Sequence, residues 1–322
     1  MKRRKHKCFA IMMLLAALLS GGILSAGQGK SGSDRQPLLV STDWLLHHLH
    51  DPSLVVLHIT AFKSEYEAEH IPGARLVPWL SVVTPPPQPG SGGLTSELPS
   101  VAQLDSVLES VGLSDDSHVV IYGSVVAAAR LFWTLQELGF AGPLSILDGG
   151  LDAWREEKKP LTSTLPTITR GTFTPLPRPD VVVDAEWLKS HLQTPKTRIV
   201  DARLPYYYLG ADSGGMARAG HIPGAANIPY TTLTKELSKY RDVKTLQRLF
   251  EDAGVRENEQ VIAYCHVGQT ASVVYVAAQL LGHDVRIYDG SFQDWAKRSE
   301  LPIEMTVHPS TGKEQSRDDL MG

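Results

Sequence analysis

The pentapeptide His-Ile-Pro-Gly-Ala occurs at residues 70–74 and again, unchanged, at residues 221–225. Further blocks recur around both copies in the same order: Val40, Trp44, Leu45, His48, Leu49 and Pro52 match Val183, Trp187, Leu188, His191, Leu192 and Pro195; residues 118–122 match residues 260–264; Asp148, Gly149 and Trp154 match Asp289, Gly290 and Trp295. A series of blocks repeated in one order predicts a duplicated domain.

Each copy shows short β-rich runs that alternate with helical ones. This alternation predicts an α/β fold in which each copy is a parallel sheet with helices on both faces. We expect an N-terminal domain at residues 36–165, a proline-rich linker at 166–180, a C-terminal domain at 181–308 and a polar tail at 309–322. Residues 85–100 are rich in Pro, Gly and Ser and predict a mobile surface segment.

The repeated His-Ile-Pro-Gly-Ala motif invites two interpretations. Its histidine could serve as a ligand or a base, or the Pro and Gly could simply shape a turn. The motif stands in both copies although only one copy holds a cysteine at its possible site, so we favour the structural role. Trp154 and Trp295 are interpreted in the same way, as core residues.

The first 27 residues have the pattern of a secretory signal peptide. A basic start with five cations precedes an apolar stretch at residues 9–19, and cleavage is expected after Gly27. An uncleaved anchor stays open, but the short apolar run favours a periplasmic or secreted protein. Cleavage would take the net charge from −4 to −9 by removing those five cations. Nucleic acid and anionic membranes are therefore not expected partners.

Of the two cysteines, Cys8 falls in the expected signal peptide, which leaves Cys265 as the single thiol of the mature chain. A lone thiol in an oxidising compartment indicates chemistry, although a small buried apolar residue is the alternative. The two copies differ at this place: after the strand ending at Tyr122 the first continues with Gly123, whereas after Tyr264 the second continues with Cys265. A cysteine between a parallel strand and a helix lies where α/β proteins bind ligands, and loop N–H groups there favour an anion.

The run Cys265-His266-Val267-Gly268-Gln269-Thr270-Ala271, together with His-Ile-Pro-Gly-Ala and Asp-Gly-x4-Trp, resembles the active loop and flanking motifs of the rhodanese family. The whole chain resembles its tandem-domain thiosulfate and mercaptopyruvate sulfurtransferases. The resemblance implies that Cys265 is catalytic, that residues His266, Val267, Gly268, Gln269, Thr270 and Ala271 bind substrate, and that the first copy is catalytically degenerate. Asp201 and Arg203 match the family's Asp-x-Arg element as supporting residues, where the first copy has His58 and Thr60. Two roles stay open for them: they could pair with each other and orient loops, or they could contact the substrate.

The implied reaction is a ping-pong transfer of sulfane sulfur. Thiolate Cys265 takes sulfur from thiosulfate or a similar small anionic donor, holds it as a persulfide and gives it to cyanide or a thiol, with no metal or organic cofactor. His266 could supply a cation or a proton, or could point into solvent. Family members that use thiosulfate efficiently often carry basic residues where this chain has His266, Val267 and Tyr207. The mercaptopyruvate branch usually has a more compact, Gly/Ser-rich loop, which this chain does not match either. The donor therefore stays open, with another persulfide or a thiosulfonate among the alternatives.

Two alternatives from other classes remain. A phosphatase would need an arginine at the sixth position after the cysteine, where Ala271 stands, so this alternative is weak. An exported binding or redox-sensing module without turnover is stronger, but it would have no need of an intact Gly268-Gln269-Thr270 loop. No residue of the first copy is assigned to the site from the sequence; Arg130, just after the degenerate loop, is the one cation to inspect there.

Overall fold

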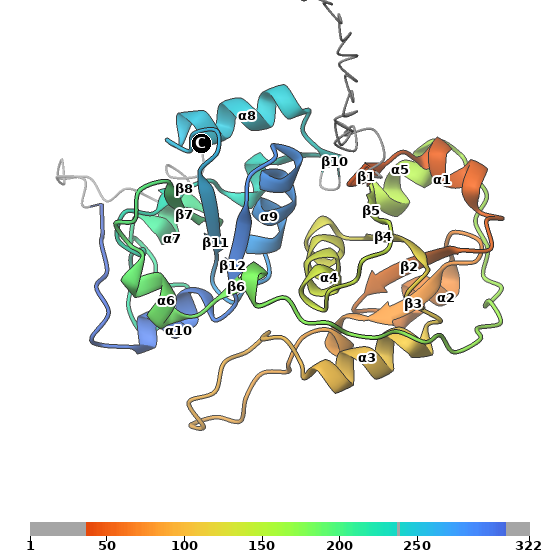
Figure 1. Cartoon of the computed structure of the whole chain (residues 1–322), viewed down its shortest axis with the longest axis horizontal. Helices are drawn as coiled ribbons and strands as arrows, with labels where there is room; N and C mark the ends of the chain where they lie inside the picture. Colours follow the sequence, from red (N-terminus) through yellow and green to blue (C-terminus); the bar gives the residue numbers. More distant parts are fainter. Residues whose placement is uncertain (1–36, 237–238, 307–322) are drawn as a thin grey trace, which may run out of the picture. The chain divides into compact units, whose positions relative to one another are not determined.

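The computed structural model describes residues 37–236 and 239–306 (Figure 1). The expected signal peptide at 1–27 and the polar tail at 309–322 lie outside the described residues. No helix within the described ranges is both long and apolar enough to cross a membrane.

In the first copy strands alternate with helices, as expected from the sequence. Its elements are β1 (Leu39–Val40), α1 (Thr42–His48), β2 (Leu54–Thr60), α2 (Lys63–Ala68), β3 (Arg75–Pro78), η1 (Trp79–Ser81), α3 (Val101–Ser110), β4 (His118–Gly123), α4 (Val125–Glu137), β5 (Leu144–Leu147) and α5 (Gly150–Glu156). Ser41 caps α1, because its side chain accepts a hydrogen bond from the N–H of Trp44 at 3.1 Å.

The second copy repeats this order and adds a small hairpin. Its elements are η2 (Pro179–Val181), β6 (Val182–Val183), α6 (Ala185–Ser190), β7 (Thr197–Asp201), α7 (Pro205–Tyr208), β8 (Ala226–Asn227), η3 (Tyr230–Thr232), β9 (Thr234–Lys235), β10 (Lys239–Tyr240), α8 (Val243–Asp252), β11 (Gln260–Tyr264), α9 (Ala271–Leu280), β12 (Val285–Tyr288) and α10 (Ser291–Lys297). Asp184 caps α6 as Ser41 caps α1, by accepting from the N–H of Trp187 at 2.7 Å.

Each copy forms one five-stranded parallel sheet. The strand orders are β1-β5-β4-β2-β3 and β6-β12-β11-β7-β8, which is the same topology twice. Alternate residues of β2 enter two different apolar clusters, with Val55 and Leu57 on one face and Leu54 and Val56 on the other. Both faces are therefore buried beneath helices, and the expected fold class is confirmed.

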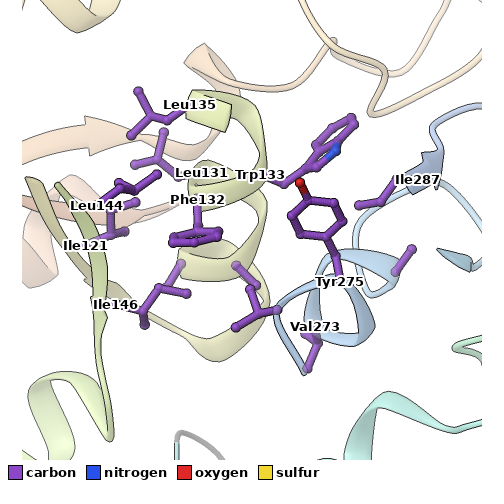
Figure 2. Packing of buried hydrophobic residues seen from close by; sticks show 14 of the residues in the cluster. Ile121, Leu131, Phe132, Trp133, Leu135, Leu144, Ile146, Val273, Tyr275 and Ile287 are labelled. Atoms are coloured by element: carbon purple, nitrogen blue, oxygen red, sulfur yellow. The ribbon is translucent and has the colours of Figure 1, made fainter. Parts of the chain in front are cut away.

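The two copies share one apolar cluster. It runs from β4 and β5 through α4 to α9 and β12, and Figure 2 shows Phe132 of α4 facing the sheet while Trp133 faces Tyr275 and Ile287. At the edge of this contact, Gln136 accepts hydrogen bonds from the hydroxyl of Tyr275 at 2.6 Å and from the amide of Gln279 at 2.8 Å. The copies are thus packed against each other through their central helices.

The aspartate of the Asp-Gly pair also connects the two copies. In each copy its side chain accepts a hydrogen bond from a backbone N–H of the other copy. Asp289 accepts a hydrogen bond from the N–H of Leu98 in the first copy at 2.9 Å. Asp148 accepts the matching bond from the N–H of Tyr240 in the second copy, also at 2.9 Å. A motif that the sequence shows only as a repeat therefore links each domain to the other.

The structural interpretation of the repeated histidine and tryptophan is confirmed. His70 and His221 are buried and each directs Nδ1 to a backbone carbonyl, of Tyr66 and Tyr208 respectively, at 2.7 Å. Each also forms a backbone bridge to the segment that follows the last helix of its own copy, at Thr162 and Glu304 respectively. The indole N–H of Trp154 and of Trp295 donates at 2.7 Å to the carbonyl of the proline that follows its helix.

The expectation of a mobile surface segment at residues 85–100 is wrong for its last part. Ser96 is buried, and the backbone of Thr84 and Ser96 is paired, with Ser96 N–H donating to the carbonyl of Thr84 at 3.1 Å. Pro, Gly and Ser disfavour helix and strand but do not prevent a chain from packing as an irregular segment. This segment lies against the second copy, where no sequence pattern would have placed it.

Candidate active site

Cys265 directly follows β11, and the loop at residues 265–270 leads to the first turn of α9 at Ala271. This is the position expected from the sequence. The residue is 1% exposed and belongs to the apolar cluster that the two copies share. A ligand that reaches the sulfur must therefore be small or must displace part of the surrounding chain.

The active loop, as we call residues 265–270, is held from behind by the start of α10. The N–H of Cys265 donates to Oγ of Ser291 at 3.2 Å, and its carbonyl accepts from the N–H of Phe292 at 3.0 Å. The carbonyl of His266 accepts from the N–H of Gln293 at 2.9 Å. Within the described part of the chain, the N–H groups of residues 266–271 have no hydrogen-bond acceptor. The loop thus offers unpaired donors beside a fixed cysteine.

Arg130 of the first copy reaches into the active loop. Its Nη1 donates to the carbonyl of Gly268 at 2.9 Å and pairs with Asp289 at 2.7 Å, and its Nη2 donates to the carbonyl of Ser96 at 2.9 Å. Its side chain is fully buried, with the guanidinium 4.4 Å from the ring centre of Trp133. The sequence singled out this cation but predicted no contact for it, because two of its partners, Gly268 and Asp289, are more than 130 residues away. Arg130 is a positioning residue that fixes the loop.

Gly268 allows this close approach. Its φ is +78°, a left-handed value that favours glycine, and a Cβ there would lie 2.7 Å from the carbonyl oxygen of Asp289 and 3.0 Å from Nη1 of Arg130. The amide of Gln269 donates to Oγ of Ser96 at 2.6 Å. Two of the expected substrate-binding residues therefore connect the loop to the first copy.

A second acidic group lies beside the Arg130–Asp289 pair. Glu97 accepts a weak hydrogen bond from the amide of Gln293 at 3.4 Å. Burial, with the nearby carboxylate of Asp289 as the next cause, raises the pKa of Glu97 to about 8, and Arg130 opposes that rise. This part of the interface therefore binds a proton near neutral pH.

Asp201 and Arg203 form a buried ion pair with each other. Nη2 of Arg203 lies 2.6 Å from Asp201 and donates to the carbonyl of Gly220 at 2.7 Å, and both side chains are fully buried. The guanidinium also lies 4.0 Å from the ring centre of Phe292. The geometry shows a structural role, since this pair orients the turn before His221, while Nη1 of Arg203 is buried and has no hydrogen-bond partner within the described residues.

His266 is neither a cation at neutral pH nor exposed to solvent. It is partly buried rather than pointing into solvent, with the ring of Tyr207 edge-on at 4.4 Å. Burial first, and the positive charge of Arg203 second, lower the pKa of His266 to about 4, so the ring is neutral at neutral pH. Tyr207 occupies the place where a basic residue was sought, and it supplies packing to His266 instead of charge.

The remaining expected binding residues lie on the loop and at the start of the helix. Val267 and Thr270 are partly buried, Thr270 makes no capping hydrogen bond, and Ala271 is fully buried as the first residue of α9. No cluster of three or more His, Cys, Asp or Glu side chains suited to a metal ion occurs among residues 37–236 and 239–306.

The first copy has no counterpart of the active loop. Its helix α4 begins at Val125, two residues after Gly123, and Ser124 caps it by accepting from the N–H of Ala127 at 3.3 Å. In the second copy the helix begins six residues after Cys265. The residues that form a loop in one copy therefore form the first turns of a helix in the other.

Comparison with known proteins gives the same two domains. A model of the rhodanese-like domain matches residues 41–157 and again residues 184–298. The chain is 30% identical to the sulfur carrier protein TtuD of Thermus thermophilus over 83% of this chain and 96% of that protein. It is 31% identical to the 3-mercaptopyruvate sulfurtransferase of Escherichia coli K12, over 82% and 97%, and 28% identical to a putative thiosulfate sulfurtransferase of Mycobacterium tuberculosis H37Rv, over 84% and 99%.

Solved structures share the fold at lower identity. The anaerobic ergothioneine biosynthesis enzyme of Chlorobium limicola, solved with trimethyl histidine, superposes with a TM-score of 0.73 at 23% identity. The match covers 84% of this chain and 71% of that enzyme. At this identity the likeness concerns the fold alone.

Proposed function

This chain belongs to the rhodanese-like domain family, and on that premise we propose that it is a sulfurtransferase that carries sulfane sulfur as a persulfide on Cys265. One observation supports this proposal above all. Cys265 stands at the carboxyl end of β11, and the unpaired N–H groups of residues 266–271 follow it in the chain. Those donors are suited to hold the anionic persulfide and an anionic donor beside it.

The reaction has two half-steps. The thiolate of Cys265 attacks the outer sulfur of the donor, a new S–S bond forms, and the donor's remainder leaves with the electron pair of the bond that breaks, as sulfite in the case of thiosulfate. A thiol or cyanide then attacks the outer sulfur of the persulfide, takes that sulfur and restores the Cys265 thiolate. Each step exchanges one nucleophile for another at sulfur, so no oxidant, metal or cofactor enters the scheme.

The charges around the active loop favour donors with a single negative charge. His266 is neutral at neutral pH, and Arg203 is already paired with Asp201. The loop N–H groups and the start of α9 then provide the positive potential, without a free cation from either of these residues. A dianion such as thiosulfate loses more hydration on entering such a site than a monoanion such as mercaptopyruvate. We therefore expect mercaptopyruvate or a small persulfide to load Cys265 faster than thiosulfate.

The decisive experiment is the intact mass of the protein after exposure to each donor, before and after cyanide. A gain of one sulfur that cyanide removes supports the proposal, and the variant Cys265→Ser should show no gain while keeping its circular dichroism spectrum and melting temperature. Sulfur uptake by the folded serine variant would contradict it. If no donor among thiosulfate, mercaptopyruvate and a small persulfide loads the wild type, the binding or sensing module without turnover becomes the better assignment.

A second proposal concerns the cellular compartment of the protein. We infer export to the periplasm or the exterior from the signal-like pattern of residues 1–27, which lie outside the described residues. The N-terminal sequence of the protein recovered from a periplasmic fraction tests this, with residue 28 as the expected first residue.

A further inference from the structure

A cavity lies at the position that the active loop of the first copy would have occupied, and residues 230–236 of the second copy close one side of it. The cavity has a volume of about 1300 Å³ and is lined by Gly123, which matches Cys265, and by the start of α4. Typical sites for small ligands enclose roughly 300–1,000 Å³, so this space is large enough for one. Where the second copy has its active loop, the first copy therefore has an open cavity and not packed side chains.

His58 at the floor of this cavity lacks hydrogen-bond partners. It occupies the register position of Asp201, since His58 lies opposite Tyr122 as Asp201 lies opposite Tyr264. The residue is 4% exposed, lines the cavity and stacks on Tyr122 at 4.4 Å between ring centres. Neither of its ring nitrogens is hydrogen bonded within the described residues, and Nδ1 is fully buried. Nδ1 is out of reach of a ligand, whereas the unpaired Nε2 is not fully buried and can donate to a group bound in the cavity.

The start of α4 adds hydrogen-bond donors to the same floor. This helix has 13 residues, and within the described residues the N–H groups of Val125 and Val126 have no acceptor. Both residues line the cavity. A helix start of this length carries positive potential and favours an anionic group. The floor therefore suits the negative end of a ligand.

The wall of the cavity carries the opposite charge. Four carboxylates line it, namely Glu65, Glu69, Asp152 and Glu236. The single cation in the lining, Arg155, is already bound to Glu69 at 2.5 Å and to Asp152 at 3.1 Å. Burial as the first cause lowers the pKa of His58 to about 4, so this side chain adds no positive charge at neutral pH. The wall therefore keeps a surplus of three negative charges.

These features disfavour ligands that carry only one kind of charge. A plain anion would meet the surplus carboxylates, and a plain cation would meet the positive start of α4. We propose that the cavity of the first copy binds a small zwitterion, with its anionic group at His58 and the start of α4, its ammonium group at the carboxylates, and an apolar body against Ile59, Leu151 and the valines. This site is separate from Cys265 and does not depend on sulfur transfer.

Two matched sets of compounds test the charge requirement. The first set is 6-aminohexanoate, hexanoate and hexylamine, and the second is L-phenylalanine, 3-phenylpropanoate and phenethylamine. Ligand-observed NMR titrations of the full chain should show that at least one zwitterion binds about tenfold more tightly than both of its single-charge analogues. If neither zwitterion exceeds its analogues, the proposal is wrong.

Matched variants then locate the site. Glu65→Gln removes a lining carboxylate and should weaken zwitterion binding severalfold, whereas Glu67→Gln, on the same helix but outside the lining, should leave it unchanged. His58→Phe keeps the stacking on Tyr122 but not the ring nitrogens, and Val126→Trp fills the cavity, so both should weaken binding at least tenfold in folded protein. Equal binding by Val126→Trp would overturn the proposal.

The catalytic site provides the last control. Cys265→Ser should bind the zwitterion as well as the wild type does, and Glu65→Gln should keep the wild-type rate of sulfur transfer. Loss of zwitterion binding in Cys265→Ser would place the ligand at the active loop and contradict a second site. These outcomes do not depend on whether any donor loads Cys265.

Discussion

The two copies have the same sheets, and they differ where each central strand ends. In the second copy the chain makes an open loop after β11, held from behind by α10 and by Arg130 of the first copy. In the first copy the chain enters α4 almost at once and leaves a cavity. The comparison teaches that the two copies differ in backbone at this place and not only by Gly123 in place of a cysteine.

The largest effect is expected from an attempt to restore the lost site. In a Cys265→Ser background, the substitution Gly123→Cys should not recover sulfur uptake, which stays at least about 1,000-fold below the wild type. The new thiol would lie at a helix start without a loop around it, and a Cβ at this place would collide with the carbonyl oxygen of Ile59. Intact mass after loading with each donor measures this. Uptake by the folded double variant would show that the loop is dispensable.

Arg130→Met tests the contact between the copies at the active loop. Removing the cation leaves Asp289 buried beside an uncompensated carbonyl, which should lower the free energy of unfolding by about 3–5 kcal/mol. Urea denaturation measures the loss, and adding Asp289→Asn should recover part of it.

In the first copy, Asp148→Asn removes a charge that accepts only a backbone N–H among the described residues, so the free energy of unfolding should fall by only about 1 kcal/mol. Equal losses of stability in Arg130→Met and Asp148→Asn would show that the contacts of Asp289 and Asp148 between the copies contribute equally.

Gly268→Ala separates backbone strain from steric contact at the active loop. Gly268 and Gly282 both have positive φ, at +78° and +81°, but a Cβ at Gly282 meets nothing within 4 Å. Both alanine variants should lose about 1 kcal/mol of stability from strain. Only Gly268→Ala should also slow the loading of Cys265, by roughly tenfold or more, because Asp289 and Arg130 must move. Equal loading rates in the two variants would argue against a fixed loop.

A smaller effect is expected from the proton held by Glu97. Because folding raises the pKa of Glu97 to about 8, the folded chain binds more protons than the unfolded chain between about pH 4.5 and 8. Its contribution to stability is complete below that window and is lost as the pH rises through it. Glu97→Gln should therefore stabilise the protein at pH 9 by roughly 1–2 kcal/mol, a value reduced for solvent screening, and leave it unchanged near pH 4. Melting temperatures across this range test the sign, with the exposed Glu67→Gln as control.

Much of the architecture was predicted from repeats and local chemistry. The recurrence of His-Ile-Pro-Gly-Ala and the alternation of helical and strand patterns predict two parallel sheets, because a turn motif and a hydrophobic period act on neighbouring residues. The position of Cys265 at a strand end follows in the same way, since it needs only the end of one apolar run and the start of the next. The role of His266 could not be read from its type, because its protonation depends on burial beneath Tyr207.

What the sequence determined by itself is the fold of each copy, the order of its elements and the one copy that holds a nucleophile. Only the tertiary structure decided that Arg130, Ser96 and Asp289 meet behind the active loop, that Asp201 and Arg203 neutralise each other, and that His58 lies unpartnered in a cavity. Burial and charge pairing join residues that are far apart in the chain. They follow from how the sheets and helices pack, and no local pattern records them.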